Sequence, residues 1–228
     1  MKSNFENKLI RTKDKLVLMR LLALKDLQEI SKWPHYTAKE FLWANFNYQS
    51  PQDHRFWFRG NSTEKNFWFS VFIDSTLLQN LDQTRQYLKA LSFGESVDLK
   101  TKEEPKKGLF RRKTADPLLV GRISTLVPDS LDELIFGIAL HPDFLELGIG
   151  TIATQMYLFA TFELTSVKSV WLETQSGNAR AQHVYEKIGF QRLGYHYKAN
   201  SMGRQEKRYS YVFRREWRDR LPSIFEIS

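Results

Sequence analysis

The chain has 228 residues, of which 42% are apolar and 14% aromatic, and it contains no cysteine. This length and composition exclude global disorder and allow a substantial core, so we expect residues 1–228 to form a single domain. The lack of cysteine excludes disulfides, thiol nucleophiles and thiolate metal sites. No run reaches the roughly 18 apolar residues of a membrane helix, and the first residues lack the apolar core of a signal peptide, so we expect a cytoplasmic protein without a membrane partner.

The formal net charge of +8 is concentrated in one segment. Residues 100–113 hold seven basic and two acidic residues, a net charge of +5. Two interpretations stay open for this segment. It is either a solvated loop or a contact surface for an acidic partner, such as RNA or an acidic protein.

The first elements along the chain are short. Residues 16–21 predict an apolar strand, and residues 25–33 predict a helix because their apolar positions lie three apart. A second helix is expected over residues 37–46, where Thr37 and Glu40 have the spacing of a capping box.

An aromatic region and an apparent insertion follow. Residues 66–74 are rich in aromatic and β-branched side chains and predict a buried strand. The wider aromatic run over residues 55–69 is interpreted as core strand plus rim, in preference to a base-stacking platform or a hydrophobic substrate groove. Residues 75–116 are interpreted as an insertion that consists of a leucine-rich helix followed by the basic segment 100–113.

The rest of the chain alternates strands and helices. The expected elements are strands at 117–127 and 132–141, a helix after Gly148, a strand at 170–174, a helix ending near Gly189, and strands at 190–198 and 208–217. The resulting order is β-α-α-β, insertion, β-β-α-β-α-β-β. This order predicts an α/β or α+β sandwich built on one mixed sheet.

The stretch IALHPDFLELGIGT runs from a strand through a turn into a helix. Glycines at positions 148 and 150 allow a tight turn and let an anion approach the backbone. The N–H groups of a helix start, with about half a positive charge from the helix dipole, favour an anion there. Because Gly-x-Gly also occurs in ordinary turns, this loop alone supports an anion site and a plain turn about equally.

A second constellation surrounds the last predicted helix. Asn178, Ala181 and Tyr185 lie near one helical face, and Glu173 lies on the strand before them. Strand and helix can therefore place a carboxylate and a phenol on opposite sides of one cleft. Each residue also has a purely structural explanation, with Asn178 as N-cap, Ala181 as a packing site and Gly189 as C-cap.

Together these segments resemble the two acetyl-CoA motifs of the GNAT family of N-acetyltransferases. HPDFLELGIGT is similar to a motif of the form Gln/Arg-x-x-Gly-x-Gly/Ala, and NARAQHVYEKIGF matches Asn-x-x-Ala-x-x-x-Tyr-x-x-x-Gly-Phe at every fixed position. LVLMRLLALKDLQEI and GRQEKRYSYVFRREW further resemble the branch that acetylates ribosomal-protein N-termini. The resemblance covers about residues 13–74 and 117–218 and leaves the insertion at about 75–116 unmatched.

The resemblance implies a mixed, mostly antiparallel sheet flanked by helices and splayed at the acyl-CoA site. Acetyl-CoA is the implied co-substrate, without a metal. The implied donor-binding residues form the pyrophosphate loop, the pantetheine-binding strand and the start of the last helix: Leu147, Gly148, Ile149, Gly150, Thr151, Ile138, Leu140 and Asn178. Asn178 would contact the pantetheine or orient the acid. Tyr185 is the implied acid for the departing thiolate, and Glu173, twelve residues earlier, is the candidate base.

The implied reaction is direct attack of a primary amine on the thioester, with a protein N-terminus, a lysine or a small amine as acceptor. An attacking amine must be neutral, which explains the need for a base. The alternative is a non-catalytic member of the fold that senses acyl-CoA or binds ribosomes or RNA through residues 100–113. That segment could also reach the 3′-phosphate of CoA.

The chain departs from the family pattern in the first motif. Leu145 stands where Gln or Arg is usual, and Glu146 brings a negative charge toward the expected pyrophosphate. Arg180 and Arg192 could supply a cation, although a solvated surface role is favoured for each. None of the five histidines has metal-ligand spacing, and His183 is the only one expected near the site.

Overall fold

The computed structural model describes residues 1–95, 117–200 and 203–228, apart from the side chains of residues 39 and 40. Within these ranges the strands form one sheet in the order β7-β8-β6-β5-β4-β3-β2-β1-β9. The strands are β1 Ile10–Thr12, β2 Val17–Leu21, β3 Asn66–Asp74, β4 Pro117–Leu126, β5 Glu133–Leu140, β6 Ser169–Gln175, β7 Gln191–Ala199, β8 Gln205–Arg214 and β9 Phe225–Ile227. Only the β5–β6 pair is parallel among them, so the sheet is mixed and mostly antiparallel, as expected.

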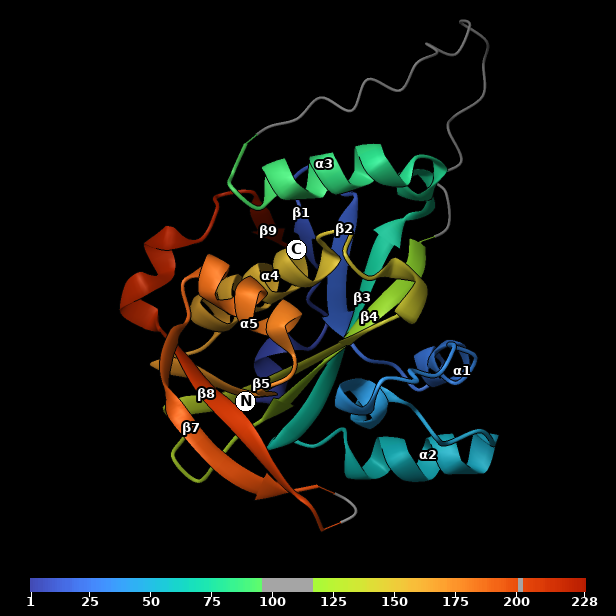
Figure 1. Ribbon diagram of the computed structural model, residues 1–228. Helices are drawn as coiled ribbons and strands as arrows, with labels where there is room; N and C mark the ends of the chain where they lie inside the picture. The colour runs from blue at the N-terminus through green and yellow to red at the C-terminus, as the bar shows by residue number, and fades with distance from the viewer. Residues whose placement is uncertain (96–116, 201–202) are drawn as a thin grey trace, which may run out of the picture.

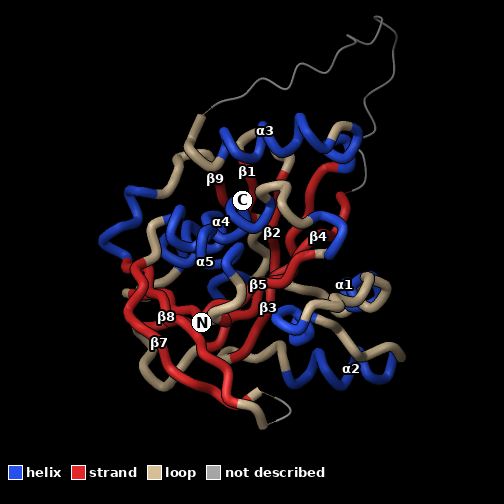
Figure 2. The backbone as a smooth tube through the Cα atoms, in the orientation of Figure 1, coloured by secondary structure: helices blue, strands red, loops and turns tan. Residues whose placement is uncertain are grey.

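Helices cover both faces of the sheet (Figure 1). The α-helices are α1 Asp26–Ile30, α2 Pro51–Gly60, α3 Leu81–Leu91, α4 Ile149–Leu164 and α5 Ala179–Ile188. Short 3₁₀ helices are η1 Lys2–Phe5, η2 Lys39–Ala44, η3 Ser75–Gln79, η4 Pro142–Phe144 and η5 Arg215–Arg220. Figure 2 shows α4 and α5 together on one side of the sheet and the α1–α2 region on the other.

Strand β3 separates two hydrophobic cores. Phe67 and Phe69 face the larger core with α4, whereas Trp68 and Phe72 face the smaller core with α1 and α2. The alternation follows from the period of two along a strand. The register of β3 against β4 shifts between Val71 and Phe72, where the pairing of the two strands is irregular. Burial of each large side chain contributes about 1.5–3 kcal/mol, so both cores fix the sheet between its helix layers.

Helix α1 is anchored by a buried carboxylate. Asp26 is 4% exposed and accepts hydrogen bonds from Arg20, at 2.7 and 2.8 Å, and from the Ser70 hydroxyl, at 2.7 Å. The backbone N–H of Ala23 donates to the same carboxylate. Although burial raises the pKa of Asp26, the hydrogen bonds from Arg20, Ala23 and Ser70 lower it on balance. This network ties α1 to strands β2 and β3.

Most predicted elements are confirmed. The strand expected at residues 66–74 has the same limits as β3, and the strand expected at 170–174 lies within β6. The helix expected after Gly148 is α4, and the one ending near Gly189 is α5. Strands β1 and β9 were not predicted, because three residues carry too little pattern to recognise.

The region between α1 and β3 differs from the prediction. Residues 37–46 hold only the 3₁₀ helix η2, which has no side-chain cap at Ala38. The capping box lies further on, where the Ser50 side chain and Asp53 cap the start of α2 with Pro51 in its first turn. The aromatic run at residues 55–69 is therefore half helix and half strand, and the interpretation as strand plus rim is wrong for its first part.

The first part of the insertion is helical, as expected. It forms η3 and α3, and α3 packs against α4. The basic segment 100–113 lies outside the described residues. Within the described ranges, we find no helix with the length and apolarity needed to cross a membrane.

Candidate active site

Strands β5 and β6 separate partway along their length. Their parallel register comprises Glu133↔Ser169, Leu134↔Val170 and Ile135↔Trp171 and ends there. Beyond this point β5 continues along β4 as far as Leu140, and β6 continues along β8. The two strands therefore form the sides of a wedge, with residues 136–140 of β5 along one edge.

The alternation of an antiparallel ladder decides which β5 groups face this wedge. The His141 N–H donates to the Val120 carbonyl at 2.8 Å. The backbone N–H and C=O groups of the odd-numbered β5 residues therefore point toward β4, and those of the even-numbered residues point away from it. The backbone groups of Ile138 and Leu140 consequently point into the wedge. The Leu140 carbonyl accepts a hydrogen bond from the Tyr36 hydroxyl at 2.6 Å. Both strand residues expected to bind the donor thus lie at the open edge.

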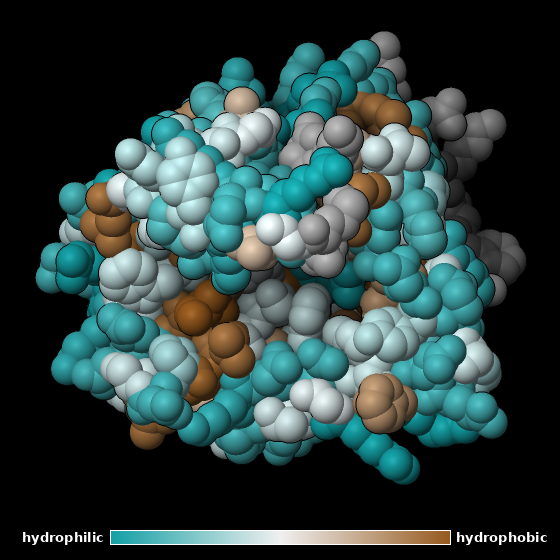
Figure 3. All heavy atoms as spheres, turned by 60° about the horizontal axis from the view of Figure 1, so that its bottom comes forward, coloured by the Kyte–Doolittle hydropathy of each residue, from teal (hydrophilic) through white to brown (hydrophobic). Residues whose placement is uncertain are grey.

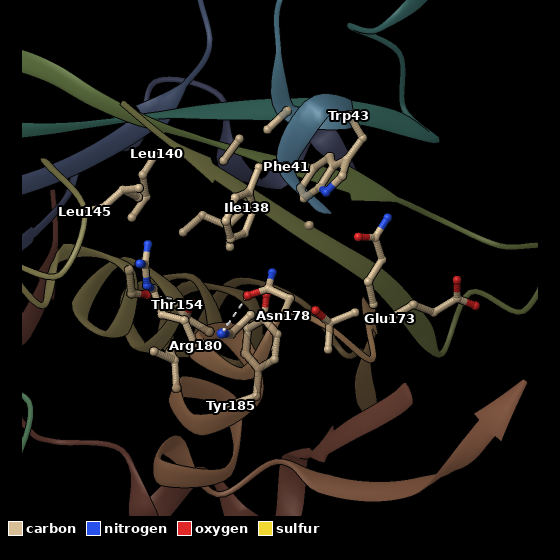
Figure 4. A pocket seen from close by; sticks show the side chains of 18 of the residues that line it. Phe41, Trp43, Ile138, Leu140, Leu145, Thr154, Glu173, Asn178, Arg180 and Tyr185 are labelled. Atoms are coloured by element: carbon tan, nitrogen blue, oxygen red, sulfur yellow. Dashed lines mark hydrogen bonds between the residues drawn. The ribbon is translucent and has the colours of Figure 1, made fainter. Parts of the chain in front are cut away.

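A cavity of about 300 Å³ occupies the wedge. Ile138 and Leu140 form one wall, Asn178 and Tyr185 the opposite wall, and Phe41 and Trp43 of η2 the third (Figure 4). The η2 aromatics were not expected at the site, because the capping-box spacing found at residues 37–46 predicts only a helix and not a binding role. Figure 3 views the side that carries α2, where the surface is hollowed and apolar side chains gather beside the hollow.

The loop before α4 has the backbone geometry of an anion site. Gly148 is the N-cap of α4 with φ of 94°, a left-handed conformation that favours glycine. A Cβ at Gly148 would lie 3.2 Å from the Leu88 Cβ, and one at Gly150 would lie 3.3 Å from the Leu140 Cδ1. The first N–H groups of a helix lack intrahelical partners and favour an anion; here the Thr151 N–H donates to the Gly148 carbonyl at 3.1 Å, so Ile149 and Gly150 begin the free end of the helix. The side chains of Leu147, Ile149 and Thr151 are buried, so the loop presents mainly backbone groups to a ligand.

Glu146 is paired with an arginine. Arg180 Nη2 donates to Glu146 Oε1 at 2.6 Å, and Arg85 Nε donates to the Glu146 carbonyl at 3.2 Å. Arg180 also lines the cavity, and its side chain lies near Leu145 in Figure 4. Arg180 is exposed, as expected for a surface residue, and its ion pair with Glu146 places it at the rim of this cavity. Arg192 pairs with Glu186 and is not among the residues that line this cavity.

Asn178 and Tyr185 reach the cavity from α5. The Asn178 side chain accepts a hydrogen bond from the Ala181 N–H at 3.1 Å, which confirms that it is an N-cap, and it also lines the cavity. Gly189 is confirmed as the left-handed C-cap. The Tyr185 side chain is 7% exposed, and burial, followed by the neighbouring Tyr211, raises its pKa. Its phenol stays protonated at neutral pH and can donate a proton.

Glu173 lies on the other face of the sheet within a charged cluster. Its carboxylate contacts His196 at 3.3 Å, Lys198 at 3.2 Å and Arg208 at 4.0 Å. Figure 4 shows the carboxylate directed away from Tyr185. The histidine that reaches this candidate base is His196, so the expectation that only His183 lies near the site is wrong. These contacts depend on the β7–β8 hairpin and have no local sequence signal.

Within the described part of the chain, no group of three or more histidine, aspartate or glutamate side chains is placed to hold a metal ion. The chemistry available at this site consists of backbone N–H donors, a buried phenol, a carboxylate and nearby cations. The N–H donors and cations can bind an anionic ligand that lies in the wedge, and the phenol and carboxylate can donate or accept protons there.

Comparison with known proteins identifies the family. Residues 16–191 match the model of the acetyltransferase (GNAT) domain, and the chain belongs to the GNAT family. A 61-residue segment is 39% identical to the [ribosomal protein bS18]-alanine N-acetyltransferase of Salmonella typhimurium, which covers 26% of this chain and 40% of that enzyme. The match thus spans less than half the length of that relative.

Solved structures share the fold. A GNAT-family acetyltransferase from Bacillus anthracis superposes with a TM-score of 0.56 at 17% identity, over 91% of this chain and 99% of that one. The spermidine/spermine N-acetyltransferase of Vibrio cholerae has a TM-score of 0.57 at 13% identity, over 89% and 94% of the two chains. At these identities the likeness concerns the fold.

Proposed function

We propose that this chain is an acetyl-CoA-dependent N-acetyltransferase that moves an acetyl group directly to a primary amine, with residues 1–228 acting as one domain. The observation that carries the proposal is the β5–β6 wedge, which has Tyr185 on one side of the sheet and Glu173 on the other. A ligand that lies between the strands can meet a second reactant from the opposite face. Membership of the GNAT family supports the same reaction class.

The donor would lie along the wedge with its pyrophosphate at the start of α4. The wedge-facing backbone groups of Ile138 and Leu140 would bond the pantetheine amides, as a neighbouring strand would. Backbone N–H groups of the 147–151 loop would hold the pyrophosphate. Glycine at positions 148 and 150 lets this loop pack closely against Leu88 and Leu140. Leu145 offers no side-chain donor, and Arg180, which lines the cavity and bonds Glu146 through Nη2, would supply a cation there.

The reaction needs one bond to form and one to break. The amine nitrogen attacks the thioester carbon, the C–N bond forms, and the C–S bond breaks to release the CoA thiolate. The amine proton would pass to Glu173, whose carboxylate also contacts His196 and Lys198. The thiolate takes its proton from Tyr185, whose raised pKa keeps the phenol in the donor form. A positioned acid of this kind contributes about 10²–10⁴-fold in rate.

The acceptor would enter from the face that carries η2 and Glu173. The aromatic side chains of Phe41 and Trp43 line this entrance, and Arg208 and Lys198 lie beside the carboxylate. The names of these relatives specify an alanine of ribosomal protein bS18 in one case and spermidine or spermine in the other. We therefore propose a primary amine as acceptor, with a protein N-terminus as one candidate.

Two measurements on the full chain test the proposal. Calorimetric titration with acetyl-CoA is expected to show saturable binding to one site. Release of free CoA is then followed with an alanine-initiated peptide, a lysine peptide and spermidine as acceptors. Binding with turnover on one of these amines supports the proposal, whereas no detectable acetyl-CoA binding would overturn it. Binding without turnover on any amine would favour the acyl-CoA-sensing alternative.

A further inference from the structure

A second cavity lies across α4 from the wedge. It has a volume of about 170 Å³ and is bounded by the residues after α3, the first turns of α4, the end of α5, and the end of η5 with the residues that follow it. In Figure 1 these elements lie on the face of the sheet that carries α4 and α5. Thr151 and Gln155 of α4 line this cavity, whereas Gly150 and Thr154 line the wedge. The two cavities therefore flank the same helix start.

Two cations stand at the second cavity. Lys187 Nζ is 3.3 Å from the Ser92 hydroxyl and 4.4 Å from the centre of the Phe93 ring. The Arg220 guanidinium lies over Trp217, with 4.9 Å to the ring centre. Among the described residues, no carboxylate forms an ion pair with either cation. Burial, followed by the charge of Lys89, lowers the pKa of Lys187. The cavity thus carries positive charge that an anion would balance.

A buried amide in the same cavity has an unused acceptor. The Gln155 side chain is 5% exposed, and its Nε2 donates to the Ser92 carbonyl at 3.0 Å. Its Oε1 is buried and has no hydrogen-bond partner in the described part of the chain. A buried acceptor without a partner costs about 1–3 kcal/mol, so a ligand with an O–H or N–H donor would relieve it.

We propose that this cavity binds a phosphate monoester with a neighbouring hydroxyl group. The phosphate contacts Lys187 and Arg220, and the hydroxyl donates to Gln155 Oε1. The cations match a dianion, and the amide oxygen matches a donor within the same small ligand. Two sources have this chemistry. One is the 3′-phosphate of CoA beside its ribose 2′-hydroxyl, a source that rests on the proposed function. The other is a separate sugar phosphate.

The experiment compares acetyl-CoA with 3′-dephospho-acetyl-CoA on the full chain. Calorimetry measures both affinities for the wild type and for a double variant, Lys187→Gln with Arg220→Gln. The control is Arg218→Gln, which removes an exposed arginine of η5 that pairs with Glu163 instead. Circular dichroism and thermal melting establish that each variant is folded. A third arm titrates the same proteins with ribose 5-phosphate and with inorganic phosphate.

If CoA is the source, the wild type prefers acetyl-CoA over the dephospho form by roughly tenfold or more, because charged hydrogen bonds are lost. The double variant loses this preference and the control keeps it. If the source is separate, ribose 5-phosphate or phosphate binds the wild type and the control but not the double variant. This arm remains informative even if acetyl-CoA does not bind. Absence of both effects in the folded wild type would overturn the proposal.

Discussion

Arg180 and Glu146 form an ion pair of 2.6 Å that joins the first turn of α5 to the loop before α4. The pair stands at the place where the sequence had suggested repulsion of the donor, because Glu146 follows Leu145 in the expected pyrophosphate loop. We propose that the pair does not simply repel the donor. The carboxylate holds a guanidinium beside the N–H groups of α4, where it can meet an anionic ligand.

We predict opposite effects of neutralising the two partners. Arg180→Gln leaves Glu146 unpaired beside the donor and weakens acetyl-CoA affinity by roughly tenfold. Glu146→Gln removes the negative charge and leaves the affinity unchanged or slightly higher. The double variant therefore recovers part of the loss. Calorimetry on this double-mutant cycle measures the coupling. The control is Arg192→Gln, which removes an arginine of β7 that pairs with Glu186 of α5. Equal affinities in all variants would exclude a donor-site role for the pair.

A second prediction concerns the αL conformation at Gly148. Gly148→Ala adds a Cβ at φ of 94° and at 3.2 Å from Leu88, so it strains both the loop and its contact with α3. We expect the free energy of unfolding to fall by about 1–2 kcal/mol and acetyl-CoA affinity to fall with it. The control is Gly60→Ala, where an added Cβ meets nothing within 4 Å. Urea titration with unchanged stability of Gly148→Ala would refute this account of the loop.

A third prediction follows from the buried Asp26 network. Asp26→Asn breaks the paired hydrogen bonds from Arg20 and is expected to lower the free energy of unfolding by about 3–5 kcal/mol. The folded-state pKa of Asp26 lies below its unfolded value, so its contribution is fully present above the unfolded value of about 4 and is lost as pH falls through the folded value. Denaturation between pH 7 and pH 2 measures this. A wild type and variant that lose stability in parallel on acidification would contradict it.

A fourth prediction separates the phenol from the binding site. Tyr185→Phe removes only the proton donor, so kcat should fall about 10²–10⁴-fold while acetyl-CoA affinity stays within about threefold. Burial raises the Tyr185 pKa, so the loss of wild-type kcat from deprotonation of this phenol should begin only above the ordinary tyrosine value of about 10. Steady-state CoA release with an accepted amine measures both. A variant with wild-type kcat would remove Tyr185 from the proposed mechanism.

The sequence predicted the parts of the molecule that depend on local pattern. The limits of β3 and the caps Asn178 and Gly189 follow from side-chain periodicity and capping chemistry, and the structure has them at those positions. Helix α2 escaped prediction because its aromatic side chains resemble a strand, while its true start signal, Ser50 with Asp53, uses an aspartate in place of the usual glutamate.

The charged surroundings of the site could not be predicted in the same way. Arg180 meets Glu146 across 34 residues, and Lys198 meets Glu173 across 25. Such contacts depend on how α5 and the β7–β8 hairpin pack against the sheet, which no local pattern encodes. The motifs therefore indicated which residues belong to the cleft, and the tertiary structure was needed to place their ion-pair partners.

The most direct test of the central claim is a calorimetric titration with acetyl-CoA of the wild type and of Ala181→Trp. Ala181 lines the wedge, so an indole there fills the space between β5 and α5, whereas the control Ala179→Trp changes an exposed residue on the same helix. The account predicts saturable binding by the wild type and the control, with affinity reduced at least roughly tenfold in Ala181→Trp. Failure of the wild type to bind, or equal affinity in Ala181→Trp, would contradict it.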